Sequence, residues 1–417
     1  MSSPSTTQDF FTQVPRIPPD AIFDLTKKFL GDPDPRKVNL GQGTYKDENG
    51  APWILPVVKA AKDKTQDANH EYLPILGLAT FRKLATELVL GKDASAIALQ
   101  RVASSQALSG TGALHLAGEM LFRALGGEAP VYITKPTWSN HRQVFATIGF
   151  EVHDFKWYDD NTGQIDFESI TNTLRNAPPR SIFVFHASAH NPSGCDPSEE
   201  QWRSIARIVQ ERGLFPLFDA AYLGITSGDY DRDAFAIRHF INECGLQAAV
   251  CSSFAKNMGL YGERIGLVTF VTQSSDEAMA VESTLEQITR GEISNPPAFG
   301  ARIVSAVLED ESLRAEWARN LSTMSTRIAD MRKDLFNALI KLHAPGDWRR
   351  VVEQRGMFCI LGLSLEQVLH LREKYHIYMA DTSRISIAGL NPSNVWYTAE
   401  AITKTVQDKN LGRINYK

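Results

Sequence analysis

The stretch Cys251-Ser-Ser-Phe-Ala-Lys256-Asn-Met-Gly-Leu-Tyr-Gly-Glu-Arg264 lies between two short apolar runs, 248–251 and 265–271. Runs of this kind are typical of buried strands, so the sequence predicts two core strands joined by a loop that carries Lys256. Burial lowers the pKa of a lysine, and its neutral amine can attack a carbonyl to form a Schiff base. Arg264 and Ser253 add a guanidinium and a hydroxyl, which suits a carbonyl cofactor that also carries a phosphate. The alternative is a solvated surface loop.

Composition narrows the class of protein. The chain has 417 residues, enough for two or three domains, with 43% hydrophobic and 22% charged residues. The formal net charge is -4 and there is no basic run, so we expect no nucleic-acid partner. No apolar run approaches the roughly 18 residues of a membrane span. The N-terminal segment lacks the apolar core of a signal peptide and is poor in arginine, so we expect a cytoplasmic location.

Cysteine and histidine give no sign of a metal. The four cysteines form no Cys-x-x-Cys pair, and the ten histidines show no ligand spacing with them. We therefore expect reduced cysteines and no metal site.

From residue 131 onward, strands and helices alternate. Apolar strands are predicted at 131–134, 181–186 and 214–218, each followed by a polar loop, with a helix at 199–212; another helix is predicted earlier, at 78–90. This alternation predicts a parallel α/β sheet that is covered on both faces. Ligands bind such sheets at the carboxyl ends of the strands. The polar side chains predicted at those ends are Trp138, Asn191, Asp219 and Tyr222.

The segment Gln106-Ala-Leu-Ser-Gly-Thr-Gly112 opens a helix that is predicted to run to about residue 125. Small residues at a helix start leave free backbone N–H groups at the positive end of the dipole, which can bind an anion. Ser109 and Thr111 add hydroxyl donors on either side of Gly110. A plain capping loop is the alternative. The Gly-x-Gly loop at Gly41–Gly43 lacks the third glycine of a dinucleotide motif.

The C-terminal part is predicted to be more helical. A long amphipathic helix is expected at 312–342, and strands are expected at 358–363 and 384–388. The predicted domains are an N-terminal arm with part of a small domain at 1–50, a large domain at 51–324, and the rest of the small domain at 325–417.

Together, the strand-end residues predict a site for pyridoxal phosphate. Lys256 would hold the aldehyde, and Asp219 would pair with the pyridinium nitrogen and keep it protonated. Tyr222 and Asn191 could bind the phenolate oxygen, and Trp138 could stack on the ring. Taken singly, Asp219 could be a helix cap, Asn191 a turn residue and Trp138 part of the core.

At this point the chain resembles the aspartate aminotransferases among the fold-type I pyridoxal-phosphate enzymes, over about residues 38–388. The matching segments are Val38-Asn-Leu-Gly-Gln-Gly43, Asp47-Glu-Asn-Gly50, Glu71-Tyr-Leu-Pro74, Ser109-Gly-Thr-Gly-Ala-Leu114, Pro136-Thr-Trp138, His190-Asn-Pro192, Asp219-Ala-Ala-Tyr222, Ser253-Phe-Ala-Lys-Asn257, Ser294-Asn-Pro-Pro-Ala298 and Gly356-Met-Phe-Cys359. The resemblance implies a large, mostly parallel sheet domain and a smaller α+β domain.

The resemblance also implies roles for single residues. Lys256 would carry the cofactor and shuttle the proton, with Asp219 and Tyr222 as its catalytic partners. The cofactor phosphate would be bound by Ser109, Gly110, Thr111, Ser253 and Arg264, with Tyr72 reaching it from the other subunit. The substrate α-carboxylate would be bound by Arg384, beside Gly43, Trp138 and Asn191. Arg290, also from the other subunit, would bind the distal carboxylate, which implies a homodimer with shared sites.

The expected reaction is transfer of the amino group of L-aspartate to 2-oxoglutarate, giving oxaloacetate and L-glutamate. Gln42 and Leu223 depart from the family pattern, in which an aliphatic residue and a Gln are usual. One alternative is therefore a related enzyme that acts on another acidic amino acid, by transamination, β-elimination or β-decarboxylation. Another is a non-enzymatic binding protein on the same fold.

Overall fold

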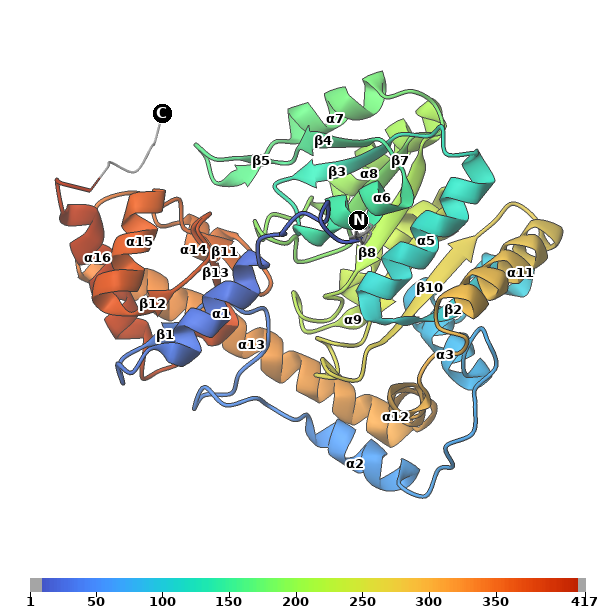
Figure 1. Cartoon of the computed structure of the whole chain (residues 1–417), viewed down its shortest axis with the longest axis horizontal. Coiled ribbons are helices and arrows are strands. Elements are labelled where there is room, and N and C mark those ends of the chain that lie inside the picture. Colours follow the sequence, from blue (N-terminus) through green and yellow to red (C-terminus); the bar gives the residue numbers. More distant parts are fainter. Residues whose placement is uncertain (1–9, 412–417) are drawn as a thin grey trace, which may run out of the picture.

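A seven-stranded sheet forms the centre of the larger part of the molecule (Figure 1). The structure, a computed structural model, describes residues 10–411, so the outermost parts of the predicted ranges 1–50 and 325–417 lie outside it. The strand order is β2-β10-β9-β8-β7-β3-β4. The strands are β2 (Val102–Leu108), β3 (Val131–Lys135), β4 (Val152–Lys156), β7 (Ile182–His186), β8 (Phe215–Ala220), β9 (Ala248–Ser253) and β10 (Ile265–Val271).

Every neighbouring pair in this sheet is parallel except the two pairs that contain β10, which is antiparallel to β9 and to β2. The connection between β9 and β10 spans only residues 254–264, whereas parallel neighbours need a crossover of about a dozen residues or more. A hairpin-like return is therefore the arrangement this length allows. The prediction of a mostly parallel α/β sheet is confirmed, with β10 as the exception.

Successive side chains along each strand point to opposite faces of the sheet and pack into two separate hydrophobic cores. Ile182 and Val184 pack in one core, while Phe183 and Phe185 pack in the other. On the first face lie α5 (Ser109–Leu125), α6 (Asn140–Ile148) and α11 (Ser275–Glu292). The second face is covered by α3 (Ala79–Leu90), α7 (Phe167–Asn176), α8 (Glu199–Arg212) and α12 (Ala298–Glu309).

The smaller part of the molecule combines both ends of the chain (Figure 1). Near the N-terminus, β1 (Val38–Asn39) pairs in parallel with β12 (Ile377–Tyr378), so the strand predicted to enter the Gly-x-Gly loop is only two residues long. β11 (Phe358–Ile360) pairs with β13 (Arg384–Ser386) in antiparallel fashion. Around these strands lie α1 (Ala21–Gly31), α14 (Arg350–Glu353), α15 (Leu365–Tyr375) and α16 (Val395–Gln407).

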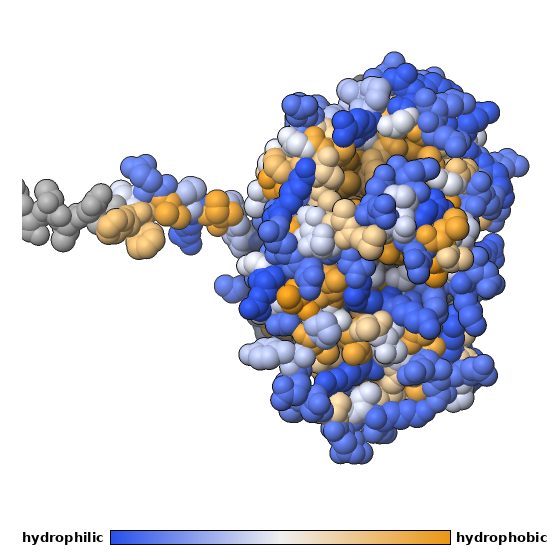
Figure 2. Space-filling model, turned by 90° about the vertical axis from the view of Figure 1, so that its right-hand side faces the viewer, coloured by the Kyte–Doolittle hydropathy of each residue, from blue (hydrophilic) through white to orange (hydrophobic). Residues whose placement is uncertain are grey.

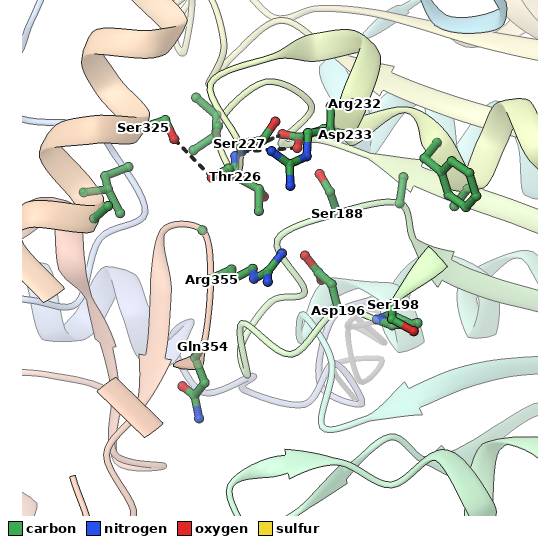
Figure 3. A pocket seen from close by; sticks show the side chains of 18 of the residues that line it. Ser188, Asp196, Ser198, Thr226, Ser227, Arg232, Asp233, Ser325, Gln354 and Arg355 are labelled. Atoms are coloured by element: carbon green, nitrogen blue, oxygen red, sulfur yellow. Dashed lines mark hydrogen bonds between the residues drawn. The ribbon is translucent and has the colours of Figure 1, made fainter. Parts of the chain in front are cut away.

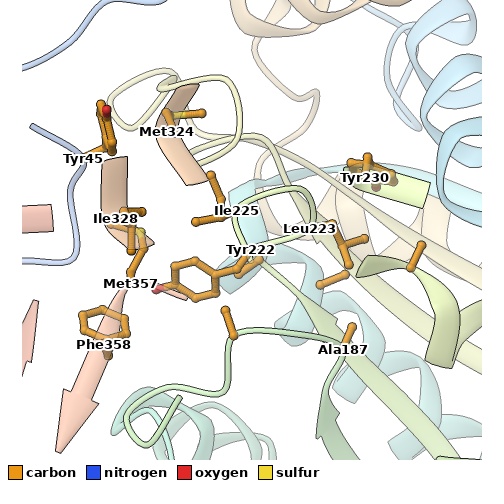
Figure 4. Close-up of a cluster of buried hydrophobic side chains, with 14 of the residues drawn as sticks. Tyr45, Ala187, Tyr222, Leu223, Ile225, Tyr230, Met324, Ile328, Met357 and Phe358 are labelled. Carbon is orange, nitrogen blue, oxygen red and sulfur yellow. The ribbon is translucent and has the colours of Figure 1, made fainter. Parts of the chain in front are cut away.

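A single long helix, α13 (Glu311–Lys341), runs between the two parts (Figure 1). Its residues Met324 and Ile328 pack with the loop that follows β8 and with the start of β11, as Figure 4 shows. The remaining elements are α2 (Pro56–Thr65), α4 (Ser95–Ala98), β5 (Tyr158–Asp159), β6 (Gln164–Ile165), α9 (Tyr230–Asp233), α10 (Phe235–Arg238), the π-helix His239–Glu243 and the 3₁₀ helix Ile387–Gly389.

The surface carries one conspicuous apolar segment. The residues next to the grey N-terminal trace project from the body of the molecule in Figure 2, and Phe10, Phe11, Val14 and Ile17 are each at least 66% exposed. Within residues 10–411, no helix combines the length and the apolar character that crossing a bilayer requires.

Candidate active site

The predicted strand-end residues meet at one edge of the sheet. β2, β9, β8, β7 and β3 run in the same direction, so the segments that follow them emerge on the same side. The chain order reverses between β3, which leads outward to β4, and β7, which leads to β8 and β9. A reversal of this kind is where open α/β sheets bind their ligands.

Asp219 is the buried charge of this edge. It lies in β8 and is 7% exposed. Its Oδ2 is 2.9 Å from Nε2 of His141, whereas its Oδ1 is buried and has no hydrogen-bond partner within residues 10–411. Burial works to raise the pKa of Asp219, but the hydrogen bond and charge of His141 outweigh it and hold the pKa below its ordinary value. Asp219 is thus an ionised carboxylate with one oxygen free for a donor.

A histidine network supports Asp219. Thr137 Oγ1 lies 2.7 Å from Nδ1 of His141 and 3.1 Å from Nε2 of His186. His186 is buried at the end of β7, and burial holds its pKa well below the ordinary value, so it stays neutral. The sequence carries no signal for His141, in the first turn of α6, or for His186, the last residue of β7, because neither forms a recognisable motif.

Lys256 lies in the turn directly after β9, two residues before Met258. Its Nζ is 5.2 Å from the centre of the Tyr222 ring. Burial lowers the pKa of Lys256 below its ordinary value; the charge of Asp219 opposes this shift and that of Arg264 adds to it. The predicted direction of the lysine pKa shift is therefore present in the structure.

Tyr222, Asn191 and Arg384 form the side of the site that faces the smaller part of the molecule. The Tyr222 hydroxyl interacts with the Asn191 side chain, and burial raises its pKa. Arg384 Nη1 donates to Asn191 Oδ1 at 3.4 Å, and Nη2 donates to the Gly41 carbonyl at 2.6 Å. Arg384 is 8% exposed, and its Nε is buried without a partner within the described residues.

The ring of Phe358 packs against the Arg384 guanidinium, a contact that the sequence did not predict. The Arg384 guanidinium lies 4.5 Å from the centre of the Phe358 ring. Figure 4 shows Tyr222 reaching toward the same ring, and the two ring centres are 6.0 Å apart. A Cβ at Gly43 would lie 2.6 Å from Cζ of Phe358, so the loop passes too close to this ring for any side chain.

Four of the residues predicted to bind phosphate, Ser109, Gly110, Thr111 and Ser253, lie together at the start of α5. The hydroxyls of Ser109 and Ser253 are 2.8 Å apart, and Gly110 lies directly over Ser253. Thr111 is half-buried in the first turn of the same helix. Arg264 is exposed, and its Nη1 donates to the Tyr261 carbonyl at 3.0 Å.

The other three predicted site residues, Trp138, Tyr72 and Arg290, are more exposed than Asp219 and Arg384. Trp138 is half-buried, and its ring is 5.4 Å from that of His141 in an edge-to-face arrangement. Tyr72 is 89% exposed. Arg290 is exposed near the end of α11, where its Nη1 donates to Ser294 Oγ. Within one chain, no hydrogen bond between described residues links Tyr72 or Arg290 to Lys256, Asp219 or Tyr222.

Across residues 10–411, His, Cys, Asp and Glu nowhere gather in a group of three that could hold a metal ion. The free cysteines Cys195, Cys251 and Cys359 are buried, and Cys244 is half-buried.

A mostly parallel sheet, with a half-buried lysine and a buried carboxylate at its carboxyl edge, defines a class of enzyme that comparison identifies. The family described as Aminotransferase class I and II matches residues 35–402, and the chain belongs to this family. The chain is 44% identical over 406 residues to the mitochondrial aspartate aminotransferase of Dictyostelium discoideum, covering 97% of this chain and 95% of that protein.

Solved structures agree with this assignment. An aspartate aminotransferase from the cytoplasm of Saccharomyces cerevisiae superposes with a TM-score of 0.94 at 40% identity, covering 96% of this chain and 99% of that chain. An aromatic-amino-acid aminotransferase from Burkholderia pseudomallei, covalently bound to pyridoxal phosphate, superposes with a TM-score of 0.93 at 39% identity, covering 96% and 100%. The predicted fold-type I architecture and the predicted transaminase activity are confirmed. The alternative of elimination or decarboxylation is not favoured.

Proposed function

We propose that this chain is a pyridoxal-phosphate-dependent aminotransferase that moves the amino group of L-aspartate to 2-oxoglutarate, giving oxaloacetate and L-glutamate. The observation that carries the proposal is the pairing of Asp219 and Lys256: an ionised carboxylate with one free oxygen, and an amine with a lowered pKa, at the same edge of the sheet. The aspartate aminotransferase at 44% identity supports aspartate as the donor.

The residues at this edge fit the cofactor. The buried Oδ1 of Asp219 can accept a hydrogen bond from a protonated ring nitrogen, and an unsatisfied buried oxygen is otherwise costly. The Ser109 and Ser253 hydroxyls, with the N–H groups of Gly110 and Thr111, offer donors for the phosphate at the positive end of α5. Arg264 adds a charge to this phosphate site, Asn191 and Tyr222 would hold the phenolate oxygen, and Trp138 would lie on the ring face.

Each residue then has a chemical task. When bound, the cofactor supplies an electron-withdrawing ring that stabilises negative charge on the substrate carbon. Asp219 keeps the ring nitrogen protonated, because its own pKa is held low by His141. Lys256 would take the proton from the substrate α-carbon and hold it at Nζ during the transfer, and its lowered pKa favours the neutral amine that this role requires. The Tyr222 ring, 5.2 Å from Nζ, limits where that amine can move.

Two arginines would select a dicarboxylate. Arg384 presents a buried guanidinium with a free Nε to the substrate α-carboxylate, beside Asn191 and the Gly43 backbone. Arg290 would bind the distal carboxylate. A bidentate pairing of guanidinium and carboxylate provides both charge and geometry, and a partner left unpaired in a buried site is penalised.

The proposal includes a homodimer. Arg290 and Tyr72 are exposed in the single chain, and the projecting N-terminal segment exposes large apolar side chains, which is what a surface covered by a second subunit would show. The division into a large domain at 51–324 and a small domain formed by 1–50 and 325–417 belongs to the same proposal. The cytoplasmic location stays a prediction from the sequence.

Mixing inactive chains tests the shared site. Lys256→Ala and Arg290→Ala each disable a different component, so a heterodimer should contain one site with neither substitution and recover part of the wild-type aspartate activity. Activity is measured after co-refolding, with heterodimers counted by differential tagging. If heterodimers form and activity stays at the level of the two variants alone, Arg290 acts within its own subunit.

A panel of amino donors tests the substrate. kcat/KM is measured for aspartate, cysteine sulfinate and phenylalanine with 2-oxoglutarate as the acceptor, and for glutamate with oxaloacetate as the acceptor, with Lys256→Ala as the inactive reference. Aspartate should exceed phenylalanine, and Arg290→Ala should lower kcat/KM for aspartate by about 10⁴-fold while leaving phenylalanine within a few fold. The exposed surface residue Arg207, changed to Ala, is the matched control.

Two results of this panel would change the proposal. A wild-type preference for phenylalanine over both dicarboxylates would overturn the two-arginine selection. A sharp rise in aspartate turnover in Gln42→Val would identify another acidic amino acid as the natural donor, since Gln42 is half-buried beside Gly43 and adds both a donor and an acceptor there.

A further inference from the structure

A cavity of 560 Å³ lies outside the proposed active site, between the sheet and the smaller part of the molecule (Figure 3). One wall is built by the loops that follow β7 and β8, within residues 187–199 and 225–236. The opposite wall is built by α13 and by residues 352–356 ahead of β11. This volume is within the range of small-molecule binding sites. None of the residues proposed above to bind cofactor or substrate lines it.

The inner end of the cavity carries unsatisfied hydroxyls. Ser188 is 7% exposed, and its buried Oγ has no hydrogen-bond partner within residues 10–411. The buried Oγ1 of Thr226 on the neighbouring loop is likewise unpartnered there. Figure 3 shows the Ser188 hydroxyl pointing toward the opening between the two walls. Buried polar atoms usually have a partner, so two such donors lining one cavity indicate that a ligand supplies the acceptor.

Two arginines stand at the mouth of the same cavity. Arg232 and Arg355 are exposed, and neither guanidinium makes a hydrogen bond or ion pair with another residue of the described chain. In Figure 3 their side chains reach toward the opening from opposite walls, and the Ser188 side chain lies to the right of the Arg232 guanidinium in this view. The other cations of the lining are engaged: Arg332 donates to the carbonyls of Val351, Gly356 and Phe358, and Lys333 is 3.4 Å from Asp330.

Two of the three carboxylates of the lining already accept hydrogen bonds. Asp196 accepts the backbone N–H groups of Ala189 and His190, and Asp233 accepts those of Gly224, Thr226 and Ser227. Burial raises the pKa of both carboxyls, although the charge of Arg355 works against this at Asp196. With Glu199, these are three carboxylates against four cationic side chains. Among the charged side chains of the lining, free hydrogen-bonding capacity therefore lies with the donors Arg232 and Arg355 and with the exposed Glu199.

We propose that this cavity is a second binding site, for a small molecule that carries a phosphate or carboxylate group, with the oxyanion held between Arg232 and Arg355 above the hydroxyls of Ser188 and Thr226. Guanidinium groups pair with either oxyanion in bidentate fashion, and neutral hydroxyl donors complete its shell. The site lies beyond the proposed transamination and does not depend on it.

Binding must be separated from anion binding at the catalytic edge. The holoenzyme is therefore saturated with glutamate and 2-oxoglutarate, an amino acid and oxo acid pair with no net reaction, and titrated calorimetrically with inorganic phosphate, with citrate and with glycerol. One anion per chain should bind, and glycerol should not. Phosphate alone binding would identify a phosphate ester as the ligand class, and citrate alone would identify a carboxylate; either result supports the site.

Substitutions place the binding event in the cavity. In the double variant Arg232→Gln/Arg355→Gln, Kd should rise at least about tenfold, and in Ser188→Ala about three- to tenfold. Arg207→Gln removes one exposed guanidinium from α8 outside the cavity and should change Kd less than about twofold. Circular dichroism and aspartate turnover confirm that each variant is folded. An unchanged Kd in the double variant, or no saturable binding of either anion below about 10 mM, would overturn the proposal.

Discussion

Asp219 and Asp233 are two buried carboxylates on either side of one loop, and their pKa values are shifted in opposite directions. Asp219, in β8, is 7% exposed and has a lowered pKa. Asp233, at the end of α9, is 8% exposed, and burial raises its pKa to about 6. Burial is thus nearly equal at the two positions, and their surroundings determine the difference.

The partners of the two carboxylates explain it. Asp219 is bound by the side chain of His141 and keeps Oδ1 free, whereas Asp233 uses both oxygens on backbone N–H groups of its own loop. Backbone dipoles hold the loop in shape without overcoming the desolvation of the charge. A buried carboxylate with a side-chain partner and an open oxygen is equipped for a ligand, while one with every oxygen used by its own loop maintains the fold.

The largest expected effect follows from removing the charge of Asp219. Asp219→Asn keeps the shape but cannot hold a ring nitrogen protonated, so kcat should fall by about 10² to 10³-fold while KM changes much less. Asp233→Asn is the matched control and should keep kcat within about threefold, since Asp233 has no proposed contact with the cofactor or the amino acid substrate. kcat and KM of both variants are measured by steady-state kinetics with aspartate. Equal losses of kcat in the two variants would show that Asp219 has no role that Asp233 lacks.

A smaller effect is expected at the partner of Asp219. His141→Phe removes a hydrogen bond to a charged group, which is worth about 10 to 100-fold in kcat. The pKa of Asp219 should rise without it, so the acid limb of the pH–kcat profile should move to higher pH. His153→Phe, which affects a half-exposed histidine 3.2 Å from Glu151, is the control. A uniform loss at every pH would mean that His141 only fills space.

The third effect concerns stability rather than turnover. The pKa of Asp233 is raised in the folded state to about 6 from 3.8, so its contribution is fully present below about pH 4 and is lost as pH rises through 6. A two-unit shift corresponds to about 3 kcal/mol. Relative to Asp233→Asn, the wild type should therefore lose up to this amount between pH 4 and pH 7, as measured by urea denaturation. A constant gap across this range would contradict the raised pKa.

The parts of the fold that the sequence predicted best have strong local signals. The helix at 199–212 has the same bounds in the structure, because Ser198 and Gln201 form a capping box at its start and Gly213 ends it with a φ of 61°. β4 was not predicted from the sequence. It is an edge strand, where polar residues are tolerated, and His153, Asp154 and Lys156 give it no apolar run. β2 was also missed: its buried Gln106 is satisfied only by the distant groups Leu78 N and Pro297 O.

The candidate site divides in the same way. Asp219, Asn191 and Lys256 lie in motifs that follow strands, so the sequence could nominate them. His141 acts through Asp219 from 78 positions away, and Phe358 acts by lying under Arg384. Such contacts depend on how the strands and the smaller part pack, which a motif does not encode.

Helix α13 reaches both ends of the site, and its stiffness has a mechanical consequence. Near its start, Trp317 Nε1 donates to the carbonyl of Asn257, the residue next to Lys256, at 2.8 Å. Fifteen residues later, about 22 Å along the axis, Arg332 is bound to the carbonyl of Phe358. The helix is therefore attached at one end to the residue next to Lys256 and at the other end to Phe358, whose ring lies against Arg384. If α13 tilts, both attachment points move together. The distance between the Lys256 amine and the Arg384 guanidinium therefore depends on the position of this one rigid helix.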